Sequence, residues 1–271
     1  MPIPTLSHSP SSTISADADA ILLAVAPSDG AAAWETTLAE WPGLAAALTA
    51  IDFKGASGAL VRVPNPHGAT PLVVAGLGAD TGVVALREAV GAGLRQLTDF
   101  AAVAVAFPGR ELTEQEAVAA LEGAGLGAYA FGAYRADGGK KRATTITVHT
   151  GAELSEASIR DAKSVVEAVA LVKDLVTTPA NDLGPADLEA VAGLPIEVEI
   201  FDEVALAAGG FGGILGVGVG SDRPPRLIKL TYSPADATKH VALVGKGITF
   251  DTGGLSLKPA GSMVGMKYDM T

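Results

Sequence analysis

Short apolar runs alternate with helical patterns over residues 16–150, and this alternation limits the folds open to the chain more than any other feature of the sequence. The runs are rich in Val, Leu and Ala and end at turn residues, as buried strands do. They lie at residues 20–25, 59–63, 72–75, 101–107 and 144–148. Strands that alternate with helices are typical of α/β proteins, so the sequence predicts an α/β domain over residues 16–150.

The helical patterns between these strands differ in how clearly they begin and end. Residues 37–49 predict a helix that is interrupted near Pro42, and residues 83–97 predict an uninterrupted one. Thr113 precedes Glu116 at the spacing of a capping box, which indicates the start of a further helix.

The longest helical pattern spans residues 155–176 and carries a stripe of apolar residues on one face. Pro179 prevents the helix from continuing, because proline lacks the backbone N–H that the helix needs. We expect residues 151–178 to form a linking helix between two domains.

Residues 179–271 contain further strand and helix signals, so a second α/β domain is expected to begin near residue 180. A short helix is predicted at residues 185–193, and strands at 196–201, 226–232 and 241–244. The Gly-rich apolar stretch at residues 209–220 is more typical of close backbone packing than of phosphate binding. Because the sequence ends at Thr271 without a cap or a polar tail, we expect only the first part of this domain to be present.

Composition excludes several classes of function. Acidic residues outnumber basic ones, 30 to 19, and the net charge of −11 repels nucleic acid and anionic lipid. The chain has no cysteine, which excludes disulfides and thiolate metal sites and fits a reducing compartment. Residues 1–15 lack the basic start and apolar run of a signal peptide and are expected to be a disordered tail. No apolar run approaches the roughly 18–20 residues of a membrane span.

The last part of the sequence places ionisable side chains among glycines. The candidates are Lys246, Asp251, Lys258 and Asp269. Charges clustered in this way are costly unless a metal ion or a substrate compensates them, and carboxylates are the ligands that hard divalent cations prefer. A lysine in such a site either donates a neutral amine to a metal or, when protonated, stabilises an oxyanion. The residues alone leave both roles open, and helix capping or surface ion pairing is the commoner role of such residues.

Other metal and nucleophile signatures are absent from the sequence. There is no His-Glu-x-x-His, no Walker A motif and no Gly-x-Ser-x-Gly. The four histidines are isolated from one another. His149 and His240 lie at predicted strand edges, and we expect them to be structural residues with satisfied hydrogen bonds rather than ligands.

The stretch from Val244 to Ala260, followed by Met266-Lys-Tyr-Asp-Met, resembles the leucyl aminopeptidase family of two-metal cytosolic exopeptidases. Weaker matches support it at residues 174–182, 224–228 and 123–134. The resemblance covers residues 16–271. It implies a small N-terminal α/β (macro-like) domain, a linking helix, and then residues 179–271 as the first part of an α/β metallo-exopeptidase domain.

The resemblance also implies roles for single residues. Lys246 is similar to the neutral lysine ligand of one metal, Asp251 to the carboxylate that bridges two metals, and Asp269 to a further ligand of the metal held by Lys246. Lys258 is similar to the catalytic lysine that polarises the scissile carbonyl. Met266 and, with less support, Ser256 correspond to positions near the substrate pocket, although a core methionine and a loop hydroxyl are the alternatives.

As a whole, the resemblance implies a cytoplasmic metalloaminopeptidase that removes N-terminal residues, leucine preferred, from peptide substrates. It implies two divalent metal ions, Mn²⁺ or Zn²⁺, and a homo-hexamer for the full-length protein. The family's downstream Asp-x-Glu-x-Arg motif, which supplies the remaining metal ligands, is absent from this sequence. We therefore expect this chain alone to bind metal weakly and to be inactive. The alternatives are a non-catalytic fragment for assembly, ligand binding or DNA binding, and a different binuclear hydrolase that shares the loop.

Overall fold

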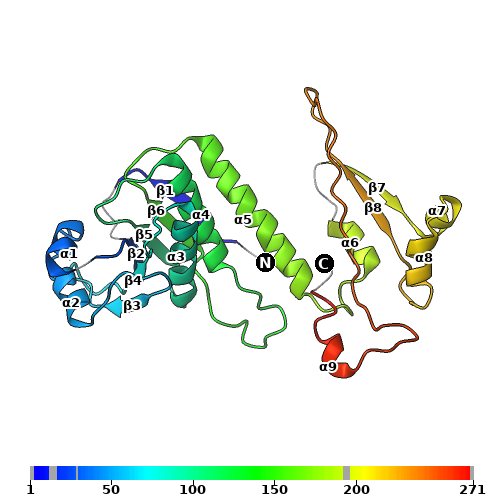
Figure 1. Cartoon of the computed structure of the whole chain (residues 1–271), viewed down its shortest axis with the longest axis horizontal. Coiled ribbons are helices and arrows are strands. Elements are labelled where there is room, and N and C mark those ends of the chain that lie inside the picture. Colours follow the sequence, from blue (N-terminus) through cyan, green and yellow to red (C-terminus); the bar gives the residue numbers. More distant parts are fainter. Residues whose placement is uncertain (1–2, 12–16, 29, 192–195, 269–271) are drawn as a thin grey trace. The chain divides into compact units, whose positions relative to one another are not determined.

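The computed structural model describes residues 3–11, 17–28, 30–191 and 196–268. The chain divides into two compact units, Met1–Leu171 and Val172–Thr271. The first unit contains a six-stranded sheet and the second a two-stranded sheet. Figure 1 shows helices flanking the sheet of the first unit. In this part of the chain, none of the helices combines the length and the hydropathy that crossing a bilayer requires.

The sheet of the first unit is mostly parallel, and it confirms the predicted α/β class. Its strand order is β1-β6-β5-β2-β4-β3, and only β3 runs antiparallel to its neighbour. The five predicted strands all form, within a residue or two of the expected bounds. The strands are β1 (Thr5–Ser9), β2 (Ala20–Val25), β3 (Leu60–Val63), β4 (Leu72–Gly76), β5 (Ala102–Ala106) and β6 (Thr145–His149).

The sixth strand, β1, corrects the expectation of a disordered tail over residues 1–15. Thr5–Ser9 pairs in parallel with β6, and the Leu6 side chain is 3% exposed in the core. The local sequence has a single large apolar residue, too little to signal a strand, so tertiary pairing overrides a weak intrinsic preference. Residues 1–2 and 12–16 lie outside the described residues.

Alternate residues of the central strands face opposite sides of the sheet, and each side packs against helices. Leu22 and Ala24 of β2 belong to one buried cluster, whereas Ile21 and Leu23 belong to another. The first cluster includes helices α3 (Val83–Gln96) and α4 (Glu114–Ala128), and the second includes α1 (Ala31–Thr37) and α2 (Leu44–Ala50). Figure 1 shows these two helix pairs on opposite sides of the sheet. Coverage of both faces explains why the central parallel strands β2, β4 and β5 are continuously apolar.

The helix predicted at residues 37–49 is wrong in its extent. The structure has two short helices, one ending at Thr37 and one beginning at Leu44. Pro42 lacks a backbone N–H, and Gly43 has a φ of 81°, so the chain turns between the helices. Trp41 precedes this turn and is 7% exposed, with its ring edge-on to His67 at a centroid distance of 5.0 Å.

Helices α3 and α4 pack closely because glycines line their contact. A Cβ added to Gly123 of α4 would lie 2.4 Å from the carbonyl oxygen of Arg87 in α3. The predicted capping box at the start of α4 is confirmed, since Thr113 and Glu116 exchange hydrogen bonds through their side chains and backbone N–H groups.

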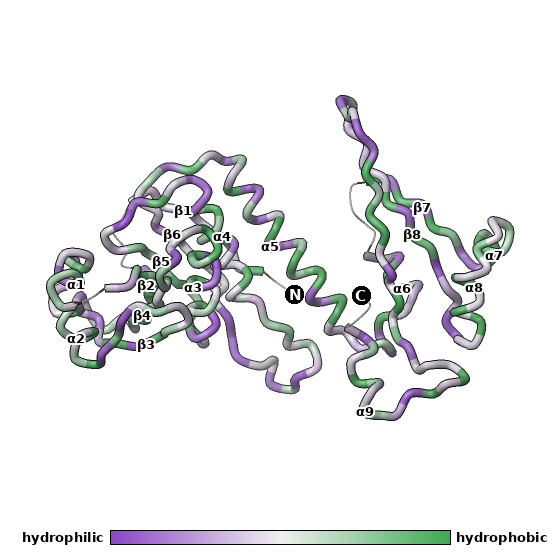
Figure 2. The backbone as a smooth tube through the Cα atoms, viewed as in Figure 1, coloured by the Kyte–Doolittle hydropathy of each residue, from purple (hydrophilic) through white to green (hydrophobic). Residues whose placement is uncertain are grey.

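Helix α5 (Glu156–Thr177) confirms the longest predicted helix, and the division between the two units falls inside it. Figure 2 shows hydrophobic and hydrophilic segments alternating along this helix. The residues that it buries in the first unit are Ala162, Val166 and Ala170.

The second unit is built from short elements around an antiparallel strand pair. These are α6 (Pro185–Val191), β7 (Glu197–Phe201), α7 (Glu203–Ala208), α8 (Gly212–Gly218), β8 (Leu227–Thr231) and α9 (Ala260–Met263). Arg226, which precedes β8, pairs with Glu189 and Glu203 and so ties α6 to α7. The predicted helix at 185–193 and the predicted strands at 196–201 and 226–232 are confirmed, with small differences at their ends; residues 192–195 lie outside the described residues.

The strand predicted at residues 241–244 does not form. The segment runs without helix or strand, and Val241, Leu243 and Val244 are 78%, 94% and 96% exposed. A strand exists only when its N–H and C=O groups pair with a neighbour, and residues 241–250 make no backbone hydrogen bond with another described residue. The apolar pattern is that of a buried strand, but the described residues provide no neighbour for it.

Candidate metal centre

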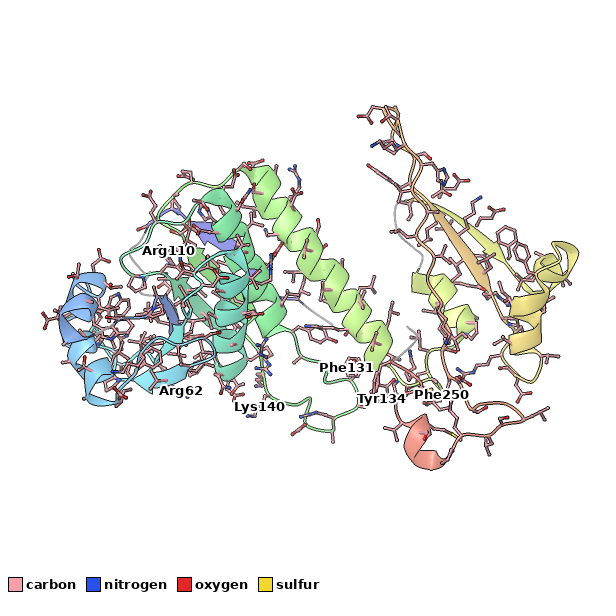
Figure 3. All side chains as sticks on the ribbon, viewed as in Figure 1. Arg62, Arg110, Phe131, Tyr134, Lys140 and Phe250 are labelled. Carbon is pink, nitrogen blue, oxygen red and sulfur yellow. The ribbon has the colours of Figure 1, made fainter. Side chains whose placement is uncertain are left out.

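The glycine-rich loop after residue 244 brings Asp251 and Lys258 together. The Lys258 ammonium donates to Oδ2 of Asp251 at 2.5 Å, and the Gly253 amide donates to Oδ1 of the same carboxylate at 2.8 Å. The loop is closed by the Lys258 amide, which donates to the Thr252 carbonyl at 2.8 Å. Phe250, labelled in Figure 3, marks where the chain enters this loop.

Gly253 makes this closure possible. Its φ of 91° lies in the left-handed region, where residues with a Cβ are strained. A Cβ at this position would also lie 2.3 Å from the Ser256 carbonyl oxygen. A glycine is therefore required for the loop to fold back and place Lys258 against Asp251.

The surroundings of Asp251 favour its ionised form. The hydrogen bond from Lys258 lowers the pKa of the Asp251 carboxyl most, and the Gly253 amide lowers it further. Burial raises this pKa, but the positive charges of Lys258 and Lys246 also lower it, and the net shift is downward. A carboxylate held ionised in this way is suited to bind a cation.

The other predicted ligands are placed less completely. The Lys246 side chain is exposed, and its charge reaches Asp251, but no hydrogen bond or ion pair of Lys246 is present among the described residues. Asp269 lies outside the described residues. The structure therefore joins Asp251 and Lys258, sets Lys246 within electrostatic reach and leaves the fourth predicted residue undescribed.

The two predicted pocket residues, Ser256 and Met266, do not bond to the Asp251–Lys258 pair through their side chains. Ser256 is exposed, and its carbonyl rather than its hydroxyl lies close to Gly253. Met266 is half-buried just after α9, where its amide donates to the Met263 carbonyl at 2.9 Å. Neither residue forms a side-chain hydrogen bond with Asp251 or Lys258.

The described donors suit a divalent cation but do not complete a coordination shell. Within residues 3–11, 17–28, 30–191 and 196–268, no group of three or more His, Asp or Glu side chains is arranged to hold a metal ion. One carboxylate, from Asp251, and one amine, from Lys246, are a chemically reasonable pair of donors for Mn²⁺ or Zn²⁺. Further ligands are needed before an ion is held firmly.

The first unit contains a cavity that the sequence analysis did not identify. Its lining includes Glu40, Glu111 and His149. His149 was expected to have satisfied hydrogen bonds, and this is wrong, because one of its ring nitrogens has no hydrogen-bond partner among the described residues. The loops that line it directly follow β5 and β6. The carboxyl ends of predicted strands, where α/β sheets bind ligands, are the signal that points to these residues.

Comparison with known families covers most of the chain. The catalytic domain of the cytosol aminopeptidase family matches residues 170–271. The N-terminal domain of the same family matches residues 27–138.

Individual relatives agree with these matches. A probable cytosol aminopeptidase of Leifsonia xyli is 48% identical over 276 residues, a match that covers 99% of this chain and 55% of the relative. The bottromycin maturation enzyme BotP in complex with Mn superposes with a TM-score of 0.73 at 29% identity, over 93% of this chain and 53% of that enzyme. The cytosol aminopeptidase of Coxiella burnetii superposes with a TM-score of 0.71 at 27% identity, over 98% and 54%.

The chain spans about half the length of the curated relatives that it matches. The part that it spans matches the family's N-terminal domain and part of its catalytic domain. The chain belongs to the cytosol aminopeptidase family.

Proposed function

We propose that this chain is part of a two-metal aminopeptidase that releases N-terminal residues, leucine preferred, from peptides. The observation that supports this most is the contact between Asp251 and Lys258, because it forms inside the segment that matches the family's catalytic domain. It places a carboxylate suited to a cation beside an ammonium suited to an oxyanion.

The proposed roles follow the chemistry of each group. Lys246, Asp251 and Asp269 would hold two divalent cations, Mn²⁺ or Zn²⁺, with Asp251 shared between them. When bound, such cations supply Lewis-acid polarisation of an oxygen atom. Lys258 would bind and polarise the scissile carbonyl through its ammonium group, which its contact with Asp251 positions. Met266 and Ser256 would lie near the substrate side chain.

The wider organisation is also part of the proposal. Residues 16–150 would form the N-terminal domain, residues 151–178 the linking helix and residues 179–271 the start of the catalytic domain. The names of the relatives support a cytoplasmic location, and a homo-hexamer is proposed for a polypeptide of the relatives' length. The net charge of −11 supports peptide rather than nucleic-acid substrates.

Activity is expected to depend on ligands beyond those of this chain. Relatives are about twice as long, and the Asp-x-Glu-x-Arg motif is absent here. We expect the 271-residue chain to show no turnover of leucine p-nitroanilide with Mn²⁺ or Zn²⁺. High turnover by this chain alone would refute the proposal that its site is incomplete.

The residue roles are tested in a polypeptide that joins this chain to the remainder of a catalytic domain as long as that of the relatives. Lys258→Ala and Asp251→Ala are expected to lower kcat by at least about 100-fold, since each removes a group that acts in the transition state. Lys229→Ala, which removes an exposed lysine paired with Glu199, is the control and should leave kcat unchanged. Retained activity in both active-site variants would remove the assigned roles.

A further inference from the structure

The last turn of helix α5 contains a carbonyl whose usual helical partner is missing. The Leu175 carbonyl would accept from the amide four residues later, but that residue is Pro179, which has no N–H. The Thr178 amide does not replace it, because it donates to the Asp174 carbonyl at 2.9 Å. The Leu175 carbonyl therefore needs a donor from another segment of the chain.

Lys267 supplies this donor. Its Nζ donates to the Leu175 carbonyl oxygen at 2.9 Å, and the residue is 8% exposed, so the bond is shielded from water. An ammonium group is favoured at this place, because the carbonyls at the C-terminal end of a helix carry partial negative charge. The bond joins two residues that lie 92 positions apart in the sequence.

Further hydrogen bonds hold the end of α5 itself. The Thr178 hydroxyl donates to the Asp174 carbonyl at 2.7 Å. Arg223 donates to the carbonyls of Ala180 and Asn181 in the turn that follows the helix. The end of α5 is thus a well-supported point to which another segment can be attached.

The segment that contains the Asp251–Lys258 pair has few other attachments. The hydrogen bonds that residues 251–266 make with other described residues all stay within this segment. Its large aliphatic side chains do not anchor it either, because those that are exposed include Leu255, Leu257 and Val264. Lys267 follows directly and links the segment to α5.

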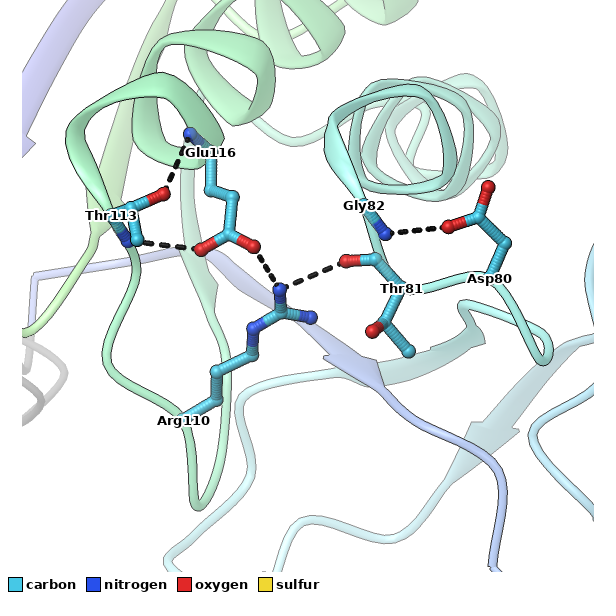
Figure 4. A network of polar contacts seen from close by, with 6 residues as sticks. All are labelled: Asp80, Thr81, Gly82, Arg110, Thr113 and Glu116. Carbon is cyan, nitrogen blue, oxygen red and sulfur yellow. Dashed lines mark hydrogen bonds and ion pairs between the residues drawn. The ribbon is translucent and has the colours of Figure 1, made fainter.

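The first unit contains a link of the same kind. Arg110 donates to the Thr81 carbonyl at 2.8 Å and forms an ion pair with Glu116, as Figure 4 shows. Thr81 lies just before α3, and Glu116 lies in the first turn of α4. One long cationic side chain thereby joins segments that are separate in the sequence. Arg110 belongs to the first unit and is therefore a matched control for the loss of such a link.

We propose that Lys267 is a positioning residue of the candidate metal centre, and that its bond to Leu175 fixes the segment of the metal ligands to the C-terminal end of α5. This inference rests on the proposed function, since it assigns Lys267 to the site of the two cations. Asp269 lies outside the described residues, but it follows Lys267 by two residues, so its Cα is within about 7 Å of the anchored one. Lys267 acts through the backbone, and the anchor reduces the conformational entropy that the ligands lose when they bind an ion.

The anchor is tested first, in the 271-residue chain. Lys267→Met removes the donor but keeps a long unbranched side chain, whereas Lys267→Arg keeps a charged donor. The carbonyl ¹³C chemical shift of Leu175 reports the hydrogen bond that this carbonyl accepts. Lys267→Met should move the shift upfield, and Lys267→Arg should leave it near the wild-type value. An unchanged Leu175 shift in Lys267→Met would overturn the proposal.

Metal binding is then measured in the polypeptide that joins this chain to the remainder of a catalytic domain, with free Mn²⁺ followed by electron paramagnetic resonance. Lys267→Met should raise the Mn²⁺ Kd about tenfold, the lower end of the effect of residues that orient metal ligands. Lys267→Arg should keep the Kd within about threefold of the wild type, because arginine also donates to carbonyls at a helix end. Two controls should leave the Kd unchanged: Arg110→Met, which loses the link of the first unit, and Lys239→Met, which changes an exposed lysine.

Activity separates a positioning role from a direct part in the reaction. At Mn²⁺ concentrations that saturate each protein, Lys267→Met should turn over leucine p-nitroanilide with kcat and KM within about twofold of the wild type, because the loss lies in metal binding. A kcat that stays at least about tenfold low at saturating Mn²⁺ would overturn the positioning role.

Asp251→Ala distinguishes the failure of this inference from the failure of the proposed function. If Asp251→Ala weakens Mn²⁺ binding and Lys267→Met does not, the metal centre stands and the role of Lys267 is overturned. If neither variant weakens it, the proposed metal centre fails and the role of Lys267 fails with it. Should Lys267→Met not fold, Lys267→Gln retains an N–H donor on a side chain one bond shorter. It should raise the Kd by less than about tenfold, and an unchanged Kd would again overturn the role.

Discussion

The two units of the chain use their apolar residues in different ways. The first unit buries two clusters, one on each face of its sheet, with residues such as Leu22 and Leu23 fully enclosed. In the second unit, the buried apolar side chains among the described residues are Leu183 and Leu206, while Leu243 and Val244 are more than 90% exposed. Yet the second unit carries the residues of the proposed metal centre. The unit that carries the proposed metal ligands therefore has few buried apolar side chains, among the described residues, to hold those ligands in place.

The largest expected difference between the units is in the response to truncating a leucine. Leu22→Ala removes a side chain that is 0% exposed, and it should cost about 3–5 kcal/mol of unfolding free energy through lost burial and a cavity. Leu243→Ala removes a side chain that is 94% exposed and should change stability by less than about 0.5 kcal/mol.

Urea unfolding measures this difference. Both tryptophans lie in the first unit, so tryptophan fluorescence follows that unit, and far-UV circular dichroism follows the whole chain. A cost above about 2 kcal/mol for Leu243→Ala would show that this segment is packed after all.

The next largest contrast concerns glycines within helices. Gly123→Ala in α4 places a methyl group 2.4 Å from the Arg87 carbonyl oxygen, so α3 and α4 must separate, at a cost of about 1–3 kcal/mol. Gly216→Ala in α8 meets nothing within 4 Å and should stabilise that helix by about 0.5–1 kcal/mol through helix propensity. The midpoint of thermal unfolding should fall for Gly123→Ala and rise for Gly216→Ala. A shift of the same sign in both variants would contradict the difference in packing.

Helix caps give a smaller contrast. Thr113→Ala removes the hydroxyl that accepts from the Glu116 amide in the capping box of the fifteen-residue helix α4, and it should cost about 1 kcal/mol. Asp202→Ala removes the bond to the Ala205 amide at the start of the six-residue α7, and should leave the stability of the first unit unchanged. Tryptophan fluorescence during urea unfolding distinguishes the two, and an equal loss from both variants would show that the units unfold as one.

The smallest expected effect is the pH dependence caused by His149. The pKa of His149 in the folded chain lies below the usual 6.5. Above about pH 6.5 the ring is therefore neutral in both the folded and the unfolded chain, and it adds no pH dependence to the unfolding free energy. As the pH falls below 6.5, the unfolded chain takes up a proton that the folded chain resists, and stability decreases until the folded pKa is passed. Urea unfolding at pH 7.5, 6.5 and 5.5 should show this loss in the wild type and a smaller one in His149→Asn. An unchanged slope in the variant would assign the pH dependence to other groups.

Much of the first unit could be predicted from the sequence, because its elements carry strong local signals. The buried strands are continuously apolar, and the Thr113–Glu116 spacing marks the start of a helix. The strand at Thr5–Ser9 could not be predicted, since its only large apolar residue is Leu6 and its formation depends on pairing with β6. Helix α1 was also not predicted. The sequence near Pro42 indicated an interruption within a single helix, and it did not indicate a separate helix that ends before this point.

The candidate sites were predictable to different degrees. The sequence named Asp251 and Lys258 among four ionisable candidates in the glycine-rich segment without indicating which of them would pair, and the loop brings these two to 2.5 Å. The strand expected at residues 241–244 failed for a physical reason, since an apolar pattern cannot supply the neighbouring strand. The cavity at the carboxyl edge combines residues from three distant segments, around Glu40, Glu111 and His149, and no local pattern joins them.

Amide hydrogen exchange of the 271-residue chain tests the central difference between the units most directly. Amides of β2, β4 and β5 are expected to be protected about 10³-fold or more, since they open only when the first unit unfolds. Amides of residues 241–250, which make no backbone hydrogen bond with another described residue, should exchange within about tenfold of the rates of an unstructured peptide. Protection of residues 241–250 equal to that of β4 would contradict the account.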